Sequence, residues 1–279
     1  MTHEPMVLGI NRTQDASICL MRGSELLWAI QKERLTRQKH HWGRVGDLAG
    51  IYAPHLPGLD PDLDPPIDVL VECYSSDAEV GRLEDYEREL EQTIRLAPGA
   101  RRARISHHLA HLYSAFHPSP FESAAVMVVD GQGSAVEDFT EHWQGHAQPH
   151  SVEVSSFYIA TRTGVECIAK QLWNRDESNP VGLGMFYFLL TNALFPGAGN
   201  EGKVMGLAPH GDPDALDMPP LEVDGHCVTI PQAWRRLLAR KERFRQPMDH
   251  PERFTDAANL AAAGQRAFEQ ALWELARWL

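Results

Sequence analysis

The 279-residue sequence predicts an α/β fold built from two related halves, and two observations carry that prediction. Short apolar runs divided by polar and glycine turns predict three strands near residues 6–31, and the same strand–turn–strand–turn–strand pattern returns near residues 124–161. Segments with helical spacing of apolar residues follow each set. Sequence identity between the copies is low, so only the pattern repeats. We expect a first half over residues 1–122 and a second half over residues 123–279.

The first half is predicted as a complete unit of strands and helices. Its turns contain Gly, Asn, Asp and Ser, and a proline-rich segment at 54–66 reads as a loop. Dense charge with apolar residues at helical spacing predicts the longer helix. The expected strands lie at 6–12, 17–21, 26–31, 67–71 and 103–106, and the expected helices lie at 44–52, at 77–95 and over the histidine-rich segment at 107–111.

The second half is predicted to be incomplete at its C-terminus. We expect strands at 124–130, 139–144 and 152–161, a buried helix at 181–195, and an amphipathic helix at 255–279 that Thr255 or Asp256 caps. The apolar face of that last helix runs to the final residue and needs something to pack against. The strands that would complete a second half are absent, so we expect either a truncated chain or a half-enzyme whose fold a second chain or domain completes.

The bulk properties exclude several classes of protein. A net charge of −12 disfavours general nucleic-acid binding. The apolar stretch at 181–195 is shorter than the roughly 20 residues that span a bilayer. The N-terminus lacks the basic start and the apolar core of a secretion signal. The four cysteines are scattered without a C-x-x-C pair, which favours reduced thiols over a disulfide frame or a zinc site. We expect a cytoplasmic protein without nucleic-acid or membrane partners.

His107 and His111 are candidate metal ligands, because residues four apart share one face of a helix. The pattern is weak alone, and the alternative is two polar residues on a partly exposed helix. Asp130, at the end of an apolar strand, strengthens the metal interpretation, because two imidazoles and a carboxylate suit divalent iron or zinc. Position 108 holds His rather than Glu, which excludes the metalloprotease helix. His108 would face elsewhere and contact a ligand or its neighbours.

Three polar turns are candidate phosphate sites. In the segment Asp130–Ser134 the glycines Gly131 and Gly133 would turn backbone N–H groups inward and Ser134 would add a hydroxyl, although many such turns are only hairpins. The turn that begins at Asn11 matches it in the first half, with a plain polar turn as the alternative. A third glycine-rich turn, at 197–206, carries Lys203, but Val204 replaces the hydroxyl residue that a P-loop requires.

A basic cluster beside the third strand is unusual in an acidic protein. One interpretation is a solvated face, and the other is capture of a phosphate or a substrate carboxylate. Its members are Lys32, Arg34, Arg37, Lys39, His40 and His41.

Together these segments resemble the O-carbamoyltransferases of the nodulation (NodU) and cephamycin (CmcH) type. The resemblance covers most of the chain, and the combination of its motifs is specific. The matching segments are 8–11 with Asp15-Ala16-Ser17, 32–37 with Lys39-His40, 106–111 with 114–116, 118–121, 129–131, and 201–209 with Gly211. Such enzymes are similar to TsaD-type tRNA threonylcarbamoyltransferases in this region, which implies the actin-like ATPase (ASKHA) fold with duplicated RNase H-like halves.

The resemblance implies a chemistry and a set of roles. In the family, a YrdC-like domain makes carbamoyl adenylate from carbamoyl phosphate and ATP, and the N-terminal domain transfers the carbamoyl group to a substrate hydroxyl. His107, His111 and Asp130 are then metal ligands. We expect His108 and Asp15 to be catalytic, with His108 as a base for the alcohol. The expected nucleotide contacts are Asn11, Arg37, Lys39, Gly131, Gly133, Ser134 and Lys203.

Two departures limit what the resemblance implies. Gln14 stands where the family usually has His, which puts acid–base contacts at that turn in doubt. The adenosine-binding segment and the YrdC-like domain are missing, so this chain alone is not expected to make carbamoyl adenylate. We therefore predict the transfer domain of an O-carbamoyltransferase that modifies a small hydroxyl acceptor. The alternative is a half-enzyme or non-catalytic subunit that binds nucleotide or substrate with a partner chain, and tRNA modification is disfavoured by the acidic charge.

Overall fold

The computed structural model describes residues 4–56, 64–73, 81–197 and 199–279, and these form a mixed α/β structure. The predicted α/β class is confirmed. The chain divides into two compact units, residues 1–110 with 138–141 and residues 111–137 with 142–279. The expected division at residue 122 describes a duplication, and that relation stays a prediction. No helix of the described residues is both long enough and apolar enough to cross a membrane.

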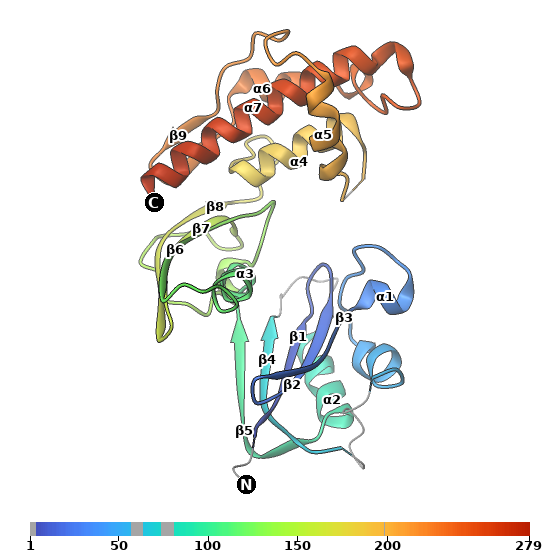
Figure 1. The fold of residues 1–279 in the computed structure, drawn as a ribbon, viewed down its shortest axis with the longest axis vertical. Coiled ribbons are helices and arrows are strands. Elements are labelled where there is room, and N and C mark those ends of the chain that lie inside the picture. Colours follow the sequence, from blue (N-terminus) through green and yellow to red (C-terminus); the bar gives the residue numbers. More distant parts are fainter. Residues whose placement is uncertain (1–3, 57–63, 74–80, 198) are drawn as a thin grey trace. The chain divides into compact units, whose positions relative to one another are not determined.

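The first unit is built on a five-stranded sheet with the order β3-β2-β1-β4-β5 (Figure 1). Its strands are β1 (Met6–Asn11), β2 (Ser17–Arg22), β3 (Glu25–Gln31), β4 (Ile67–Cys73) and β5 (Leu96–Ile105). The first three strands form an antiparallel meander, and β4 and β5 run parallel to β1. All five strands were predicted. The strand β5 begins well before the predicted residue 103. The prediction missed its early residues because they hold Pro, Gly and Arg and lack the apolar alternation that marks a strand.

Helices of this unit bury apolar side chains against the sheet. The helix α1 (Lys32–Thr36) follows β3, η1 (Leu48–Tyr52) is a π-helical turn within the predicted helix at 44–52, and α2 (Leu83–Thr93) precedes β5. Tyr86 and Leu90 of α2 share one core cluster with Leu8 of β1. The predicted helix at 77–95 is therefore confirmed over α2, while residues 77–80 lie outside the described residues.

A buried charge network ties β5 to its neighbours, and β5 leads directly into the histidine-bearing helix. Glu72 of β4 is 1% exposed and accepts hydrogen bonds from the Tyr86 hydroxyl and, at 3.1 Å, from Arg102 of β5. Burial and the neighbouring Glu72 carboxylate raise the pKa of Tyr86, which keeps its hydroxyl a donor. Arg102 also pairs with Glu87 of α2 at 2.8 Å.

The second unit contains a three-stranded antiparallel sheet, β6 (Ser123–Val129), β7 (Val152–Thr161) and β8 (Gly164–Trp173). The strand predicted at 139–144 is wrong, because β7 takes the place beside β6 and residues 139–150 form no strand. The strand β8 was not predicted. It returns beside β7 through a tight turn at 162–163. Like the first unit, this one therefore begins with a three-strand meander, but its strands come later in the sequence than expected.

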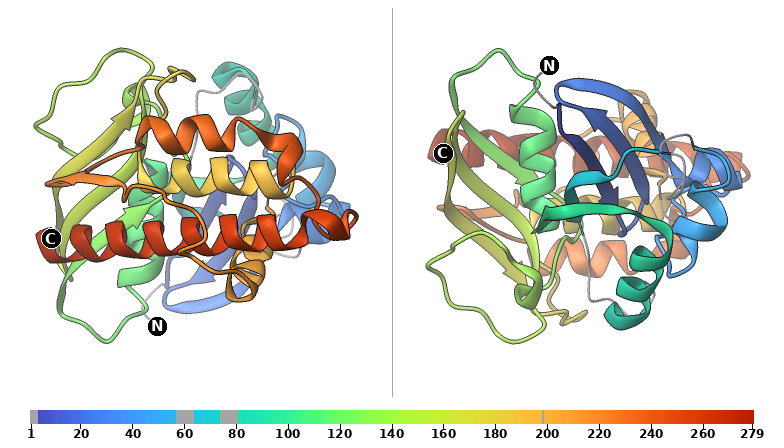
Figure 2. Two further views of the ribbon diagram at one scale, coloured as in Figure 1. Left: turned by 90° about the horizontal axis from the view of Figure 1, so that it is seen from above. Right: turned by 90° about the horizontal axis from the view of Figure 1, so that it is seen from below.

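A layer of helices accompanies this sheet, and Figure 2 shows α4, α6 and α7 running side by side. The helices are α4 (Leu183–Leu194), α5 (Glu201–Leu207), α6 (Gln232–Leu238) and α7 (Phe254–Trp278). The short elements are η2 (Val136–Asp138), η3 (Ala208–His210), η4 (Lys241–Arg243), η5 (Pro251–Arg253), β9 (Glu222–Asp224) and β10 (Cys227–Thr229).

Two local predictions about these helices are corrected. The third glycine-rich turn, at 197–206, is largely the helix α5, because Gly202 and Gly206 take helical backbone angles there. The expected side-chain cap of α7 by Thr255 or Asp256 is wrong, since the helix begins earlier and its N-cap residue, Arg253, makes no side-chain capping bond. The helices α4 and α7 themselves lie where the apolar spacing predicted them.

The main core of the second unit lies where α4 meets α7. Leu190 of α4 and Leu260 of α7 are completely buried in one cluster. The two helices approach closely at Gly264, where an added Cβ would lie 2.4 Å from Leu190 Cδ2. Phe186 packs edge-on against Trp234 of α6, with ring centroids 5.1 Å apart. This core fixes the start of α4, which contacts the candidate site described below.

We expect Leu190→Ala to lower the free energy of unfolding by about 2–5 kcal/mol, because it deletes buried methyl groups and leaves a cavity. The matched control is Leu26→Ala, since that leucine is 57% exposed and its loss is expected to change stability by less than about 0.5 kcal/mol. Urea denaturation followed by circular dichroism measures both. Equal effects of the two substitutions would contradict this description of the core.

Candidate functional site

The helix α3 (His107–Phe116) presents the two predicted imidazoles one turn apart. Its apolar side, Leu112 and Phe116, is buried in a cluster with Val128 of β6 and Tyr158 of β7. Packing on that side leaves His111 exposed at 53% and His107 partly buried. The amphipathic spacing of the helix therefore decides which residues leave the core, and the histidine pair is among them.

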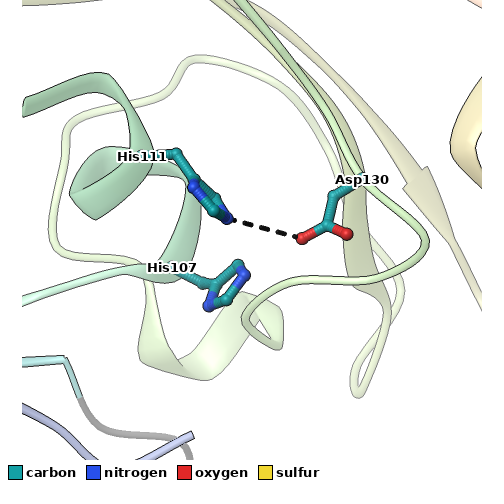
Figure 3. Close-up of side chains that lie close together, drawn as sticks. All are labelled: His107, His111 and Asp130. Carbon is teal, nitrogen blue, oxygen red and sulfur yellow. Dashed lines mark ion pairs between the residues drawn. The ribbon is translucent and has the colours of Figure 1, made fainter. Parts of the chain in front are cut away.

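Asp130 lies directly after β6, and Figure 3 shows its carboxylate facing the imidazoles of His107 and His111. The His111 Nε2 and Asp130 Oδ2 atoms are 3.8 Å apart, and one ligand atom from each of the three residues lies within 4.8 Å of the others. Ligands of a tetrahedral zinc ion lie about 3.3–3.6 Å from one another, given bonds of roughly 2.0–2.2 Å. The structure thus brings together the three residues predicted to bind a metal, at a spacing that suits a single ion.

The backbone of Asp130 is held on two sides. Its N–H donates to the carbonyl of Val154 in β7 at 3.0 Å, and its carboxylate Oδ1 accepts the Gly131 N–H at 2.6 Å. Gly184, in the first turn of α4, lies against it so closely that an added Cβ would come within 2.0 Å of the Asp130 carbonyl oxygen. Because only a residue without a Cβ fits there, Gly184 lets α4 begin directly on the backbone of Asp130.

The glycine turn after Asp130 differs from the predicted phosphate cradle. The Gly133 N–H donates to the Glu153 carbonyl at 2.7 Å, and the Ser134 N–H donates to Glu153 Oε1 at 3.1 Å. Ser134 is only 2% exposed. Backbone groups expected to bind phosphate at Gly131, Gly133 and Ser134 are therefore already hydrogen-bonded within the protein, and the turn closes onto β7 instead.

A buried ion pair lies beneath this turn. Lys170 of β8 and Glu153 of β7 are joined at 2.5 Å with no exposed side-chain surface on either. The Lys170 ammonium also donates to Ser156 at 3.0 Å and to the Tyr158 hydroxyl at 3.1 Å. Burial of a charged pair is tolerated only when its hydrogen-bonding capacity is used in this way. Sequence reasoning missed this pair, and its one signal is a charge in each of two strands that are otherwise apolar or alternating.

His108 and Lys203 stand apart from the predicted roles. His108 is completely buried, so it is not placed where a base would meet an alcohol at the protein surface, and its expected role as that base does not fit. Lys203 lies on α5 at an exposed position, with its Nζ 5.8 Å from the centre of the Phe195 ring. It is carried by a helix rather than by the glycine turn expected to present it to a phosphate.

The turn between β1 and β2 is shaped by Asn11. Its side-chain amide donates to the carbonyls of Gln14 and Asp15, each at 3.2 Å, and its Oδ1 accepts the Thr13 N–H at 3.0 Å. The predicted nucleotide contact by Asn11 is thus replaced by a structural one. Asp15 follows in the left-handed region, at φ 55°, with its carboxylate 2.9 Å from the imidazole of His40.

The basic cluster separates into one structural and several surface residues. Lys32 is 1% exposed and pairs with Asp47 at 2.8 Å, and it also donates to the carbonyl of Trp42 at 2.7 Å. Its charge therefore stabilises the loop after α1 and is not presented to an anion. Lys39 and Arg37 are both exposed, and Arg37 has a left-handed backbone. These two remain predicted contacts for an anionic group.

A family model described as carbamoyltransferase N-terminus matches residues 91–270, which is more than half of the chain. The chain belongs to the carbamoyltransferase N-terminal family. The matched segment contains α3, β6 and the turn at Asp130, so all three residues of the candidate metal centre lie inside it.

Three curated relatives illustrate how much of a carbamoyltransferase the chain represents. The nodulation protein NolNO of Sinorhizobium fredii is 31% identical over 179 residues, covering 62% of this chain and 22% of that protein. The nodulation protein NolO of Bradyrhizobium diazoefficiens is 30% identical, covering 62% of this chain and 28% of that protein. An uncharacterised protein of Synechocystis, sll1178, is 26% identical over 78% of this chain and 36% of its own length. The chain thus spans well under half of the length of these relatives.

We expect Lys170→Met to destabilise the protein by about 3–5 kcal/mol, because it leaves the Glu153 carboxylate buried without its counter-charge. The double variant Lys170→Met with Glu153→Leu is expected to recover most of that loss, since both charges are then gone. Chemical denaturation of the single and double variants measures the difference. A double variant no more stable than the single one would refute the role given to this pair.

We expect Gly184→Ala to displace Asp130, because its methyl group would overlap the Asp130 carbonyl. Overpacking of this kind costs about 1–3 kcal/mol, and binding of Zn²⁺ is expected to weaken with it. Gly202→Ala is the matched control, because an added Cβ there meets nothing within 4 Å and a helical alanine is favoured by about 0.5–1 kcal/mol. Denaturation and zinc titration compare the two, and unchanged zinc affinity in Gly184→Ala would contradict the close contact.

Proposed function

We propose that this chain is the transfer domain of an O-carbamoyltransferase, which moves a carbamoyl group from carbamoyl adenylate to the hydroxyl of a small acceptor. Membership of the carbamoyltransferase N-terminal family supports carbamoyl transfer. The observation that carries the rest is the convergence of His107, His111 and Asp130 inside the matched segment. A cation bound there would polarise a carbonyl or phosphate oxygen of the donor.

The three side chains fit a divalent iron or zinc ion. Two imidazole nitrogens and one carboxylate oxygen are a common donor set for both metals, and a site with three protein ligands keeps a position open for a substrate oxygen. Bound there, the metal supplies a Lewis acid for the carbamoyl carbonyl and lowers the pKa of a bound alcohol. His107 and His111 would hold it from α3, and Asp130 from the end of β6.

The surrounding residues prepare this site before any ligand binds. Leu112 fixes the roll of α3 on the sheet, and Gly184 fixes the backbone of Asp130. The Glu153–Lys170 pair holds the turn that follows Asp130 against β7. Rigid placement of ligands by packed elements raises affinity because little conformational freedom is lost on binding. On this proposal these residues orient the metal ligands.

On this proposal the carbamoyl donor is carbamoyl adenylate. A YrdC-like domain or chain would make carbamoyl adenylate from ATP and carbamoyl phosphate and pass it to this domain, which would contact the nucleotide and the acceptor. The three-strand meander found in each unit supports an actin-like ATPase (ASKHA) fold. Two relatives are named nodulation proteins, which is compatible with biosynthetic modification of a hydroxylated small molecule. A cytoplasmic location and the absence of nucleic-acid partners belong to the same proposal.

We expect the purified chain to bind Zn²⁺ or Fe²⁺ at this centre and His111→Ala to weaken that binding at least tenfold, since one of three ligands is lost. His146→Ala removes an exposed loop histidine and serves as the matched control. Metal content by elemental analysis, together with transfer from synthetic carbamoyl adenylate to a panel of alcohols, measures the effect. Unchanged metal content in His111→Ala would rule out the metal centre and with it this proposal.

A further inference from the structure

A second group of metal-ligand side chains lies in the first unit, outside the segment 91–270 that the family model matches. Asp15, Glu33 and His40 each offer one ligand atom, and these atoms lie within 4.8 Å of one another. They come from three segments, the turn between β1 and β2, the helix α1 and the loop that follows α1. Only this group and the His107–His111–Asp130 group meet that spacing within the described residues.

The three segments are tied together by main-chain bonds that do not depend on the three side chains. The Ala16 N–H donates to the carbonyl of His41 at 3.2 Å, and the Lys32 N–H donates to the carbonyl of Ala16 at 2.7 Å. Each of these bonds joins two of the ligand-bearing segments one residue away from a ligand. The convergence is therefore built into the backbone of the unit.

The side chains then meet in a partly open cluster. His40 Nδ1 lies 2.9 Å from Asp15 Oδ1, and the His40 backbone N–H donates to Glu33 Oε2 at 3.1 Å. Glu33 is the deepest, at 17% side-chain exposure, while His40 and Asp15 are 36% and 43% exposed. One carboxylate is thus held inside, and the imidazole and the second carboxylate face solvent.

The charges around the cluster leave room for a cation. Two carboxylates lie beside one imidazole, and the nearest buried cation, Lys32, is neutralised by Asp47 at 2.8 Å. Arg34 approaches Glu33 through Oε1, at 3.4 Å, and not through the Oε2 that faces His40. Glu33 Oε2 and the Asp15 carboxylate therefore remain on the His40 side of the cluster, while Arg34 pairs with Glu33 from the other side.

We propose that Asp15, Glu33 and His40 form a second divalent-cation site, independent of the metal centre on α3. One imidazole and two carboxylates suit Zn²⁺, Mn²⁺ or Fe²⁺, and the exposed side leaves positions for water or a ligand oxygen. Binding through Nδ1 places the ring proton on Nε2. His40 Nδ1 and Asp15 Oδ1, now 2.9 Å apart, would move apart by a few tenths of an ångström to reach the usual distance between two ligands of one ion. Acid opposes binding, because the imidazole must be neutral.

The test is the Zn²⁺ stoichiometry of the full chain, measured by calorimetry on the parent protein and on His40→Asn. Asparagine tolerates the left-handed backbone of His40, at φ 53°, and its amide still donates to Asp15, so the fold is kept while the imidazole ligand is lost. We expect two ions in the parent and one in His40→Asn, with affinity at the second site at least tenfold weaker. Glu33→Gln is the second variant, with His55→Asn as an exposed histidine control in the same unit.

The outcomes separate this site from the centre on α3. Loss of one ion in His40→Asn and of the other in His111→Ala supports both sites. A single ion that disappears only in His40→Asn supports this site and removes the metal from the proposed function. A single ion that disappears only in His111→Ala, or two ions retained in both His40→Asn and Glu33→Gln, overturns the present proposal. Mn²⁺ broadening of the His40 imidazole NMR signals, absent at His55, decides the location independently of any variant.

Discussion

The placement of Asp130 is the constraint on which the candidate metal centre depends. A carboxylate at the end of a strand is useful to a metal only if the strand end cannot fray, and here β7 receives the Asp130 N–H at 3.0 Å while Gly184 closes on its carbonyl. Both contacts are made by the backbone, which leaves the carboxylate directed toward α3 (Figure 3). The start of α4 is in turn fixed by the α4–α7 core, so the helical layer also determines where this carboxylate lies.

Buried charge provides the second level of support. The pair of Glu153 and Lys170 would cost several kcal/mol to desolvate if it were isolated. Instead, Ser134, Ser156 and Tyr158 use its remaining hydrogen-bonding positions. The result is a polar cluster inside an antiparallel sheet that has a strong preference for a single arrangement. Such clusters specify geometry more than they add stability, and here the geometry specified is that of the turn after Asp130.

The first unit uses the same strategy with a different outcome. Its buried cation Lys32 and its turn-forming Asn11 are both occupied within the protein, so neither takes the ligand-binding role that a basic cluster or a polar turn implies. Lys32 and Asn11 instead hold the loop and the turn that bring Asp15, Glu33 and His40 together. In both units, residues whose type indicates binding turn out to be structural, and they position less conspicuous residues that have the exposure a ligand needs.

The sequence alone determined the α/β class, the meander of the first unit, the helices α4 and α7, and the pairing of His107 with His111, because each follows from local periodicity along one chain segment. It misplaced the strand at 139–144 and missed β8, because alternation does not say which strand will find a partner. Only the tertiary structure decided that the amides after Asp130 are already used, that His108 is buried, and that His40 meets Asp15. Those outcomes depend on which distant groups share a hydrogen bond or a core, and no spacing within one segment encodes them.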